Sequence, residues 1–116
     1  MSETALMKNI RCALNKTGRV RVVRNQVAKG WFSRTQGGAE AWYMTFGLGL
    51  GSPDLVGTLR GGRCFCVEVK SSTGRVEEDQ TRWHKSARAW GIFVCVARSE
   101  KEALDALARA EAGGIE

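Results

Sequence analysis

Two acidic residues and a lysine lie close together near the middle of the sequence. Residues 64–70 read Cys-Phe-Cys-Val-Glu-Val-Lys, and Pro53-Asp54 comes shortly before them. Because successive side chains of a strand point to opposite faces, Glu68 and Lys70 share one face and the apolar residues between them face the other. Two carboxylates can hold a hard divalent cation through oxygen, and an ammonium beside them suits attack on a phosphodiester. The stretch therefore predicts a metal-assisted active site built on a sheet.

A predicted hairpin places the two acids next to each other. Residues 55–59 are strand-like, and Arg60-Gly-Gly-Arg63 is typical of a tight turn leading into the strand at 64–70. The two strands are therefore expected to be antiparallel neighbours. Spacing across such a hairpin can bring Asp54 and Glu68 within reach of one ion.

The glycine-rich run at residues 47–52 invites comparison with a phosphate-binding loop. Such a loop must lead into a helix whose first turn holds the phosphates. Here Pro53, Asp54 and a strand follow instead, so no nucleotide cofactor is predicted. The glycines are interpreted as a bend that brings Asp54 into the site.

A helix is predicted for residues 77–90, where Gly91 stops it. Its buried face is expected to carry Trp83, Ala87 and Trp90. Gln80 lies on that face one turn closer to the N-terminus, so its amide is predicted to point toward the sheet and to serve the site. A merely solvated glutamine is the alternative. His84 is expected at the surface.

The first helix is predicted to begin after Ser2, whose side chain can cap it, and to end near Lys16. Its apolar positions recur at helical spacing and are Leu6, Met7, Ile10, Ala13 and Leu14. Glu3 lies on the same side of this helix. Two interpretations of Glu3 stay open, an ordinary first-turn acid favoured by the helix dipole or an acid of the site.

The remaining elements predict the fold class. Further strands are expected at residues 19–27, 41–46 and 92–97, and a last helix begins at the capping box Ser99–Glu102. A chain of 116 residues can bury one core but not a second. A single α/β domain is therefore predicted, with a mixed central sheet flanked by helices.

The charge distribution suggests a polyanionic partner. The net charge is +6, and residues 1–50 hold eight Lys or Arg against two acids, whereas residues 51–116 hold ten against ten. A basic half beside a neutral half favours nucleic acid. The candidate DNA contacts are Arg19, Arg21, Arg24, Lys29, Arg34 and Arg75. For any one of them, a solvated surface position is the alternative.

Several classes of protein are disfavoured. The sequence holds no apolar run long enough to cross a membrane, and its first residues lack the pattern of a secretion signal, so a cytoplasmic protein with no membrane partner is expected. The four cysteines lack the spacing of a zinc site and are interpreted as reduced, mostly buried residues.

The motif residues resemble a known superfamily. Pro53-Asp54 followed by Glu68-Val69-Lys70 on the next strand resembles the signature of the PD-(D/E)XK nucleases. Together with Gly51–Gly57, Lys70–Arg75, Gln80 and Trp90-Gly91, it is similar to the virus-type replication-repair nuclease (VRR-NUC) family in its small stand-alone form. The resemblance covers nearly the whole chain and implies a restriction-endonuclease-like αβββαβ core.

The resemblance also implies roles for individual residues. Asp54 and Glu68, with the carbonyl group of Val69, would bind Mg²⁺ or Mn²⁺. Lys70 would orient or help deprotonate the attacking water and stabilise developing charge. Gln80 would support the site, and Glu3 matches the helix acid that such proteins often carry at the metal.

The resemblance implies a Mg²⁺-dependent endonuclease that acts as a homodimer on branched DNA such as Holliday junctions. It also implies a role in DNA repair and suggests a phage origin. Trp31, Phe32 and Trp42 are candidates for the dimer surface, with burial in the core as the alternative. A flap or nicking nuclease of the same fold stays open as a rival. A nucleic-acid binding module without catalysis is the second rival.

Overall fold

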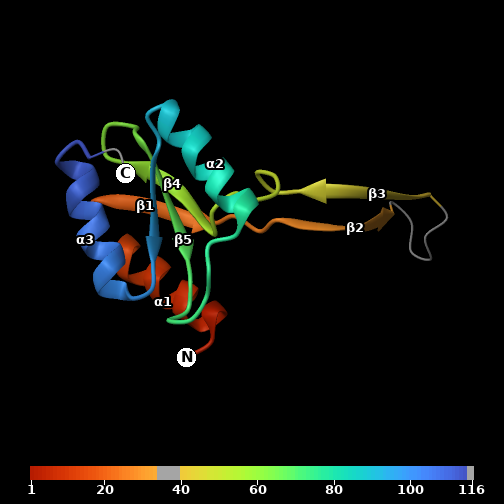
Figure 1. The fold of residues 1–116 in the computed structure, drawn as a ribbon, viewed down its shortest axis with the longest axis horizontal. Helices are drawn as coiled ribbons and strands as arrows, with labels where there is room; N and C mark the ends of the chain where they lie inside the picture. Colours follow the sequence, from red (N-terminus) through yellow and green to blue (C-terminus); the bar gives the residue numbers. More distant parts are fainter. Residues whose placement is uncertain (34–39, 115–116) are drawn as a thin grey trace.

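The computed structural model describes residues 1–33 and 40–114 and has an α/β architecture (Figure 1). The elements are α1 (Glu3–Lys16), β1 (Val20–Arg24), β2 (Ala28–Ser33), β3 (Ala41–Phe46), β4 (Leu55–Leu59), β5 (Cys64–Val69), α2 (Glu78–Ala89), β6 (Phe93–Ala97) and α3 (Glu100–Glu111). A four-stranded sheet has the order β1-β4-β5-β6. Its neighbours are antiparallel except β5 and β6, which are parallel, so the predicted mixed sheet is confirmed.

Helices cover both faces of this sheet (Figure 1). The larger core lies between the sheet and the pair α1 and α3, and its buried residues include Ile10, Leu14, Phe65, Val67, Val69 and Leu107. The smaller core lies under α2 and contains Cys66, Ala87 and Val94. The alternation along β5 therefore sends its apolar residues toward α1 and α3 and leaves the other face, with Glu68, to α2.

Local signals account for the ends of the helices. The Ser2 hydroxyl caps α1 by accepting a hydrogen bond from the Ala5 N–H at 3.1 Å. The Ser99 hydroxyl caps α3 by accepting from the Glu102 N–H at 3.1 Å. Gly91 follows the last turn of α2 with a φ of 83°, a conformation that favours glycine. All three predicted helix boundaries are confirmed to within a residue or two.

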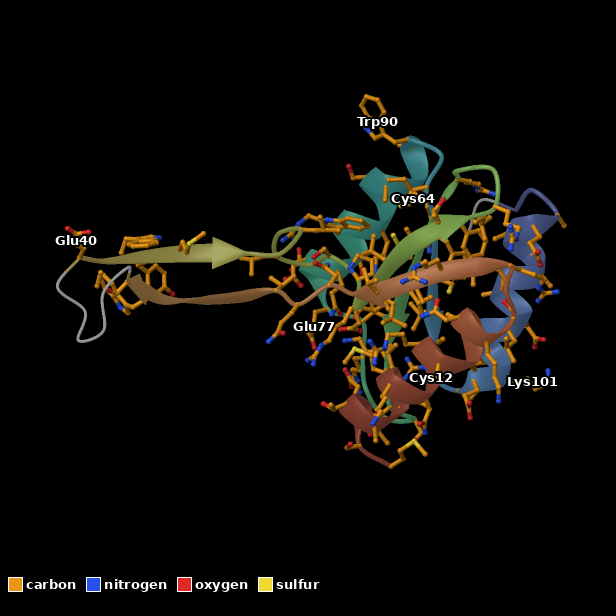
Figure 2. All side chains as sticks on the ribbon, turned by 180° about the vertical axis from the view of Figure 1, so that it is seen from behind. Cys12, Glu40, Cys64, Glu77, Trp90 and Lys101 are labelled. Carbon is orange, nitrogen blue, oxygen red and sulfur yellow. The ribbon has the colours of Figure 1, made fainter. Side chains whose placement is uncertain are left out.

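The prediction for the buried face of α2 is wrong in two places. Trp90 is 85% exposed and points away from the body of the protein (Figure 2), whereas His84 is only 3% exposed. The buried residues of α2 are His84 and Ala87, and Trp83 is half-buried against the same small core as Ala87. Trp90 follows Ala89, the last residue of α2, so it does not belong to the buried face of the helix.

β2 and β3 form a separate two-stranded ribbon, and Figures 1 and 2 show that it extends away from the main sheet. The strand predicted for residues 19–27 ends at Arg24, and the ribbon begins at Ala28. The exposed fractions of Trp31 and Tyr43 are 71% and 56%, and their rings meet edge to face at 5.6 Å. Three sequence predictions lie outside the described residues and side chains: the loop with Arg34, and the side chains of Lys29 and Phe32.

The predicted free thiols are confirmed, because all four cysteines are unbridged. Cys66 and Cys95 are buried, but Cys12 is exposed, so burial does not extend to every cysteine. Among the described residues, no helix is long and apolar enough to cross a membrane.

Candidate active site

The hairpin of β4 and β5 brings Asp54 to the end of β5. Leu55 pairs with Val67, so Asp54, one residue earlier, lies across from Glu68. The Asp54 Oδ2 atom accepts a hydrogen bond from the Val69 N–H at 2.8 Å. This bond fixes the carboxylate beside Glu68, as the sequence predicted for the two acids.

Asn25 holds the loop that leads into Asp54. Its side-chain amide donates to the Ser52 hydroxyl and to the Pro53 carbonyl, both at 2.8 Å, while its Oδ1 atom accepts from the Leu48 N–H at 3.1 Å. Its backbone N–H also donates to the Asp54 carbonyl at 2.7 Å. Asn25 was missed by the sequence analysis because its partners lie more than twenty residues away along the chain.

Gly51 brings the same loop against the first turn of α2. It has a φ of 85°, and a Cβ atom at this position would collide with the backbone of Asp79. Only glycine therefore allows the loop to approach the helix so closely. The predicted bend is confirmed, and it sets Asp54 and Gln80 along one cavity of about 230 Å³.

Glu68 and Lys70 are both buried at the end of β5, with exposed fractions of 1% and 8%. The Lys70 N–H donates to the Ala97 carbonyl at 3.1 Å, which ties this strand end to β6. Beyond Lys70, the Arg98 guanidinium donates to the carbonyls of Ser71 and Gly74, both at 2.6 Å. The segment that carries Lys70 is thus held from both sides, by β6 and by Arg98.

The two carboxylates repel each other in a partly desolvated place. Burial, followed by the hydrogen bond and the negative charge of Glu68, raises the pKa of Asp54 from 3.8 to about 7. Burial likewise raises the pKa of Glu68. The positive charge of Lys70 opposes both shifts but does not cancel them. Two such carboxylates share a proton when no cation is bound.

The donor set fits a hard divalent cation. Two carboxylates and a main-chain carbonyl offer only oxygen, which Mg²⁺ and Mn²⁺ prefer. Burial raises the pKa of Asp54 first, and the neighbouring Glu68 adds to the shift, so a cation bound between the two acids would favour their charged forms. Within the described ranges, no cluster of three or more acidic, histidine or cysteine side chains is placed to hold a metal. Besides the two carboxylates, the candidate ligands are a carbonyl group, Glu3 and water, which Mg²⁺ commonly keeps.

Glu3 and Gln80 both reach the neighbourhood of Asp54. Glu3 lines a cavity of about 170 Å³ together with Asp54, Val69 and Arg24, and its charge contributes to the raised pKa of Glu68. Gln80 lines the adjoining cavity, but its Oε1 atom accepts a hydrogen bond from the Glu77 N–H at 2.8 Å as part of a capping box. Roles for Glu3 as a ligand and for Gln80 as a support stay predictions.

His84 is the second residue that the sequence analysis missed. Its Nε2 atom lies 3.5 Å from the Glu68 Oε1 atom, and both side chains are almost fully buried. His84 lies four residues after Gln80, a spacing that puts both on one helix face and could have predicted its burial. The sequence analysis instead assigned the buried face to Trp83, Ala87 and Trp90.

The basic residues separate into those near the site and those far from it. Arg24 lines both cavities at Asp54 and also a groove of about 450 Å³ along α1, where it meets Lys8 and Arg11. Arg19 instead pairs with Glu111 of α3 at 3.6 Å. Arg21 lines a different cavity with Arg60, and Arg75 is exposed in the loop after β5. Lys8 and Arg11 had not been predicted as contacts.

The sequence matches the VRR-NUC domain family over residues 2–101. The chain belongs to the VRR-NUC family. The match spans the motif residues and every strand, and the observed helices and mixed sheet agree with the restriction-endonuclease-like fold of the family. No significantly similar sequence was found among curated proteins.

A VRR-NUC domain implies a nuclease of the PD-(D/E)XK type, with DNA as its substrate. Domains of this type generally use divalent metal ions. The family match ends near the start of α3, whose residues Ala103, Ala106, Leu107 and Ala110 are buried in the main core. α3 is therefore part of the same folded unit as the VRR-NUC match.

Proposed function

We propose that this VRR-NUC protein is a Mg²⁺- or Mn²⁺-dependent endodeoxyribonuclease that cuts branched DNA such as Holliday junctions. The observation that carries the proposal is that Asp54 and Glu68 lie together beside the buried side chain of Lys70. The pKa of each carboxyl group is raised. Burying such groups together without a counter-ion or a task is costly.

The residues divide the chemistry between them. Asp54, Glu68 and the Val69 carbonyl would hold the ion, which when bound would polarise the phosphate and make water a better nucleophile. Lys70 orients the attacking water and stabilises the negative charge that develops on the phosphoryl oxygens. Water adds to phosphorus in line with the departing ester oxygen and releases a proton to solvent as the new P–O bond forms. The P–O bond to the ester oxygen breaks, and that leaving oxygen takes up a proton from solvent.

The DNA strand would follow the cavities that meet at Arg24. One end of this path, along α1, carries Lys8, Arg11 and Arg24, and none of the three has an ion-pair partner among the described residues. Successive phosphates of one strand advance by about 3.4 Å along a duplex. Lys8 and Arg11 are separated by about 4.5 Å along the helix axis, so they suit neighbouring phosphates.

The ribbon of β2 and β3 supports assembly as a homodimer. A lone two-stranded ribbon in water is marginally stable, and this one exposes the rings of Trp31 and Tyr43. A second copy of the chain could cover these rings by two-fold symmetry, because a two-fold interface uses the same surface on both partners. Two active sites held in this way would suit paired cuts in a branched substrate.

A cleavage panel tests the proposal. The protein is incubated with four-way junctions, flaps, nicked duplexes and linear duplexes, each with Mg²⁺, Mn²⁺ or EDTA. Paired symmetric incisions of the four-way junction that require metal are expected. Cutting of flaps or nicks alone would refute the junction assignment while retaining the nuclease.

A substitution at the site completes this test. Asp54→Ala should abolish cleavage and leave junction binding nearly intact, whereas Asp105→Ala, at an exposed acid on α3, should change neither. Metal-dependent cutting by Asp54→Ala at the parent rate would refute the site. Tight binding without cutting by the parent protein on every substrate would favour the non-catalytic module.

A further inference from the structure

Two buried polar atoms near the proposed metal site have no hydrogen-bond partner. They are the Oε1 atom of Glu68 and the Nε2 atom of His84, and no described residue satisfies either of them. Their exposed fractions are 1% and 3% for the whole residues. Buried polar groups are nearly always paired, so two orphaned atoms facing each other require an explanation.

The two atoms are 3.5 Å apart, slightly beyond an ordinary hydrogen bond. Hydrogen bonds in active sites are often long without ligands and shorten when the complex forms. A small rotation of either side chain would give an N–H to carboxylate bond of normal length. The Asp54 carboxyl group also hydrogen-bonds to the Glu68 carboxylate, but within the described part of the chain the Oε1 atom of Glu68 has no hydrogen-bond partner.

The fold aims the imidazole at the acid. Ala87, one turn along α2, packs against Cys66, which lies on the same face of β5 as Glu68. This contact sets the rotation of the helix, and the helical spacing then directs His84 to the next residue on that face of the strand.

We propose that His84 is a positioning residue that donates a hydrogen bond from Nε2 to the Glu68 Oε1 atom and so leaves the other carboxylate oxygen for the metal ion. The proposal rests on the proposed function, because it gives Glu68 its role as a ligand. Nε2 carries a hydrogen in the imidazolium and in one neutral tautomer, so the contact does not depend on titration of the ring. Burial and the charges of Arg88 and Lys70 lower the pKa of His84, which favours the neutral imidazole.

Outer residues of this kind orient the ligands of a metal, and their loss commonly weakens metal binding by about 10- to 100-fold. His84→Leu keeps the volume of the side chain but removes the donor. His84→Gln keeps an N–H donor of similar reach. The matched control is Arg82→Ala, on the same helix, whose charge pairs with the exposed Glu78.

The test measures Mn²⁺ binding directly, by calorimetry on the full chain without DNA, and the thermal stability of each variant in EDTA. His84→Leu should raise the Kd for Mn²⁺ by about tenfold or more. His84→Gln should restore most of the affinity, and Arg82→Ala should match the parent. Cleavage of DNA is then titrated with Mg²⁺, and the midpoint should move in the same order.

A folded His84→Leu protein that binds Mn²⁺ as tightly as the parent would overturn the proposal, even if its thermal stability falls. Should His84→Leu fail to fold, His84→Gln and His84→Asn replace it. Equal affinity of His84→Gln and His84→Asn for Mn²⁺ would then overturn the proposal. Only the glutamine side chain is long enough to keep an N–H donor near the position of Nε2. Parent protein that binds Mn²⁺ through Asp54 but cuts no DNA would refute the nuclease and leave this inference standing.

Discussion

Replacing Asp54 by asparagine should stabilise the metal-free protein at neutral and alkaline pH. Burial and Glu68 raise the pKa of Asp54 from 3.8 to about 7. Between these values the folded state binds more protons than the unfolded state, so the stability of the parent falls as pH rises. An amide cannot ionise and should escape this loss. Its carbonyl oxygen can still accept the Val69 N–H, and its NH₂ group can donate to Glu68.

The size of the effect follows from the pKa. One pKa unit corresponds to about 1.4 kcal/mol, so a rise to about 7 sets a ceiling of about 4 kcal/mol. Asp54 is only half-buried, and water reduces the cost of its charge. Asp54→Asn should therefore exceed the parent by about 1 to 3 kcal/mol at pH 8, and the two proteins should be alike near pH 4.

Urea unfolding followed by tryptophan fluorescence, at pH 4 to 8 in EDTA, measures this difference. Asp105→Asn is the matched control, because Asp105 is an exposed acid paired with Lys101, and it should show no such gain. Adding Mn²⁺ at pH 8 should stabilise the parent and leave Asp54→Asn unchanged. Parallel stability curves for the parent and Asp54→Asn from pH 4 to 8 would refute the reasoning that two carboxylates crowd one site.

Three further outcomes are expected. Asn25→Ala loses three side-chain hydrogen bonds and should lower the free energy of unfolding by about 2 to 3 kcal/mol, with a larger fractional loss of cleavage than of DNA binding. Substituting Trp31 and Tyr43 together by serine should convert the proposed dimer into a monomer by sedimentation and abolish paired incision, while Mn²⁺ affinity is unchanged. Replacing Lys8 and Arg11 by alanine should reduce the slope of log affinity against log salt concentration by about 2.

Each of these three predictions has a control or a result that would contradict it. Replacing Lys16 and Lys101 removes the same charge from exposed positions outside the groove, so an equal change of salt slope there would contradict the strand path. A parent protein that sediments as a monomer would contradict the dimer. Unchanged stability of Asn25→Ala would show that its hydrogen bonds do not hold the loop before Asp54.

Several features could be predicted from the sequence because they depend on neighbours along the chain. The alternation in residues 64–70 decides which side chains of β5 enter the main core, and the Gly61-Gly62 turn makes β4 and β5 neighbours. The hairpin register therefore places Asp54 across from Glu68. Helix ends at Ser2, Ser99 and Gly91 likewise follow from local capping, and the order of the elements predicts the mixed sheet.

The rest depended on contacts between distant segments. In α2, helical spacing puts Ala87 on one stripe with Trp83 and on another with His84, and only packing on the sheet decides how deeply each is buried. Packing on Cys66 buries Ala87 and half-buries Trp83, as predicted, and it also sets a buried histidine against Glu68. The role of Asn25 could not be predicted either, because its hydrogen bonds are to Ser52 and Pro53, which lie near it only in the folded chain.

The sequence by itself thus determined the acidic pair, the lysine and the strands that carry them, since a hairpin and a two-residue repeat are local. Tertiary structure alone decided how those groups are held, because the rotation of a helix and the path of a loop are set by the surfaces they meet. It also decided that the β2 and β3 ribbon leaves the main sheet, exposing aromatic residues that the sequence could equally have placed in the core.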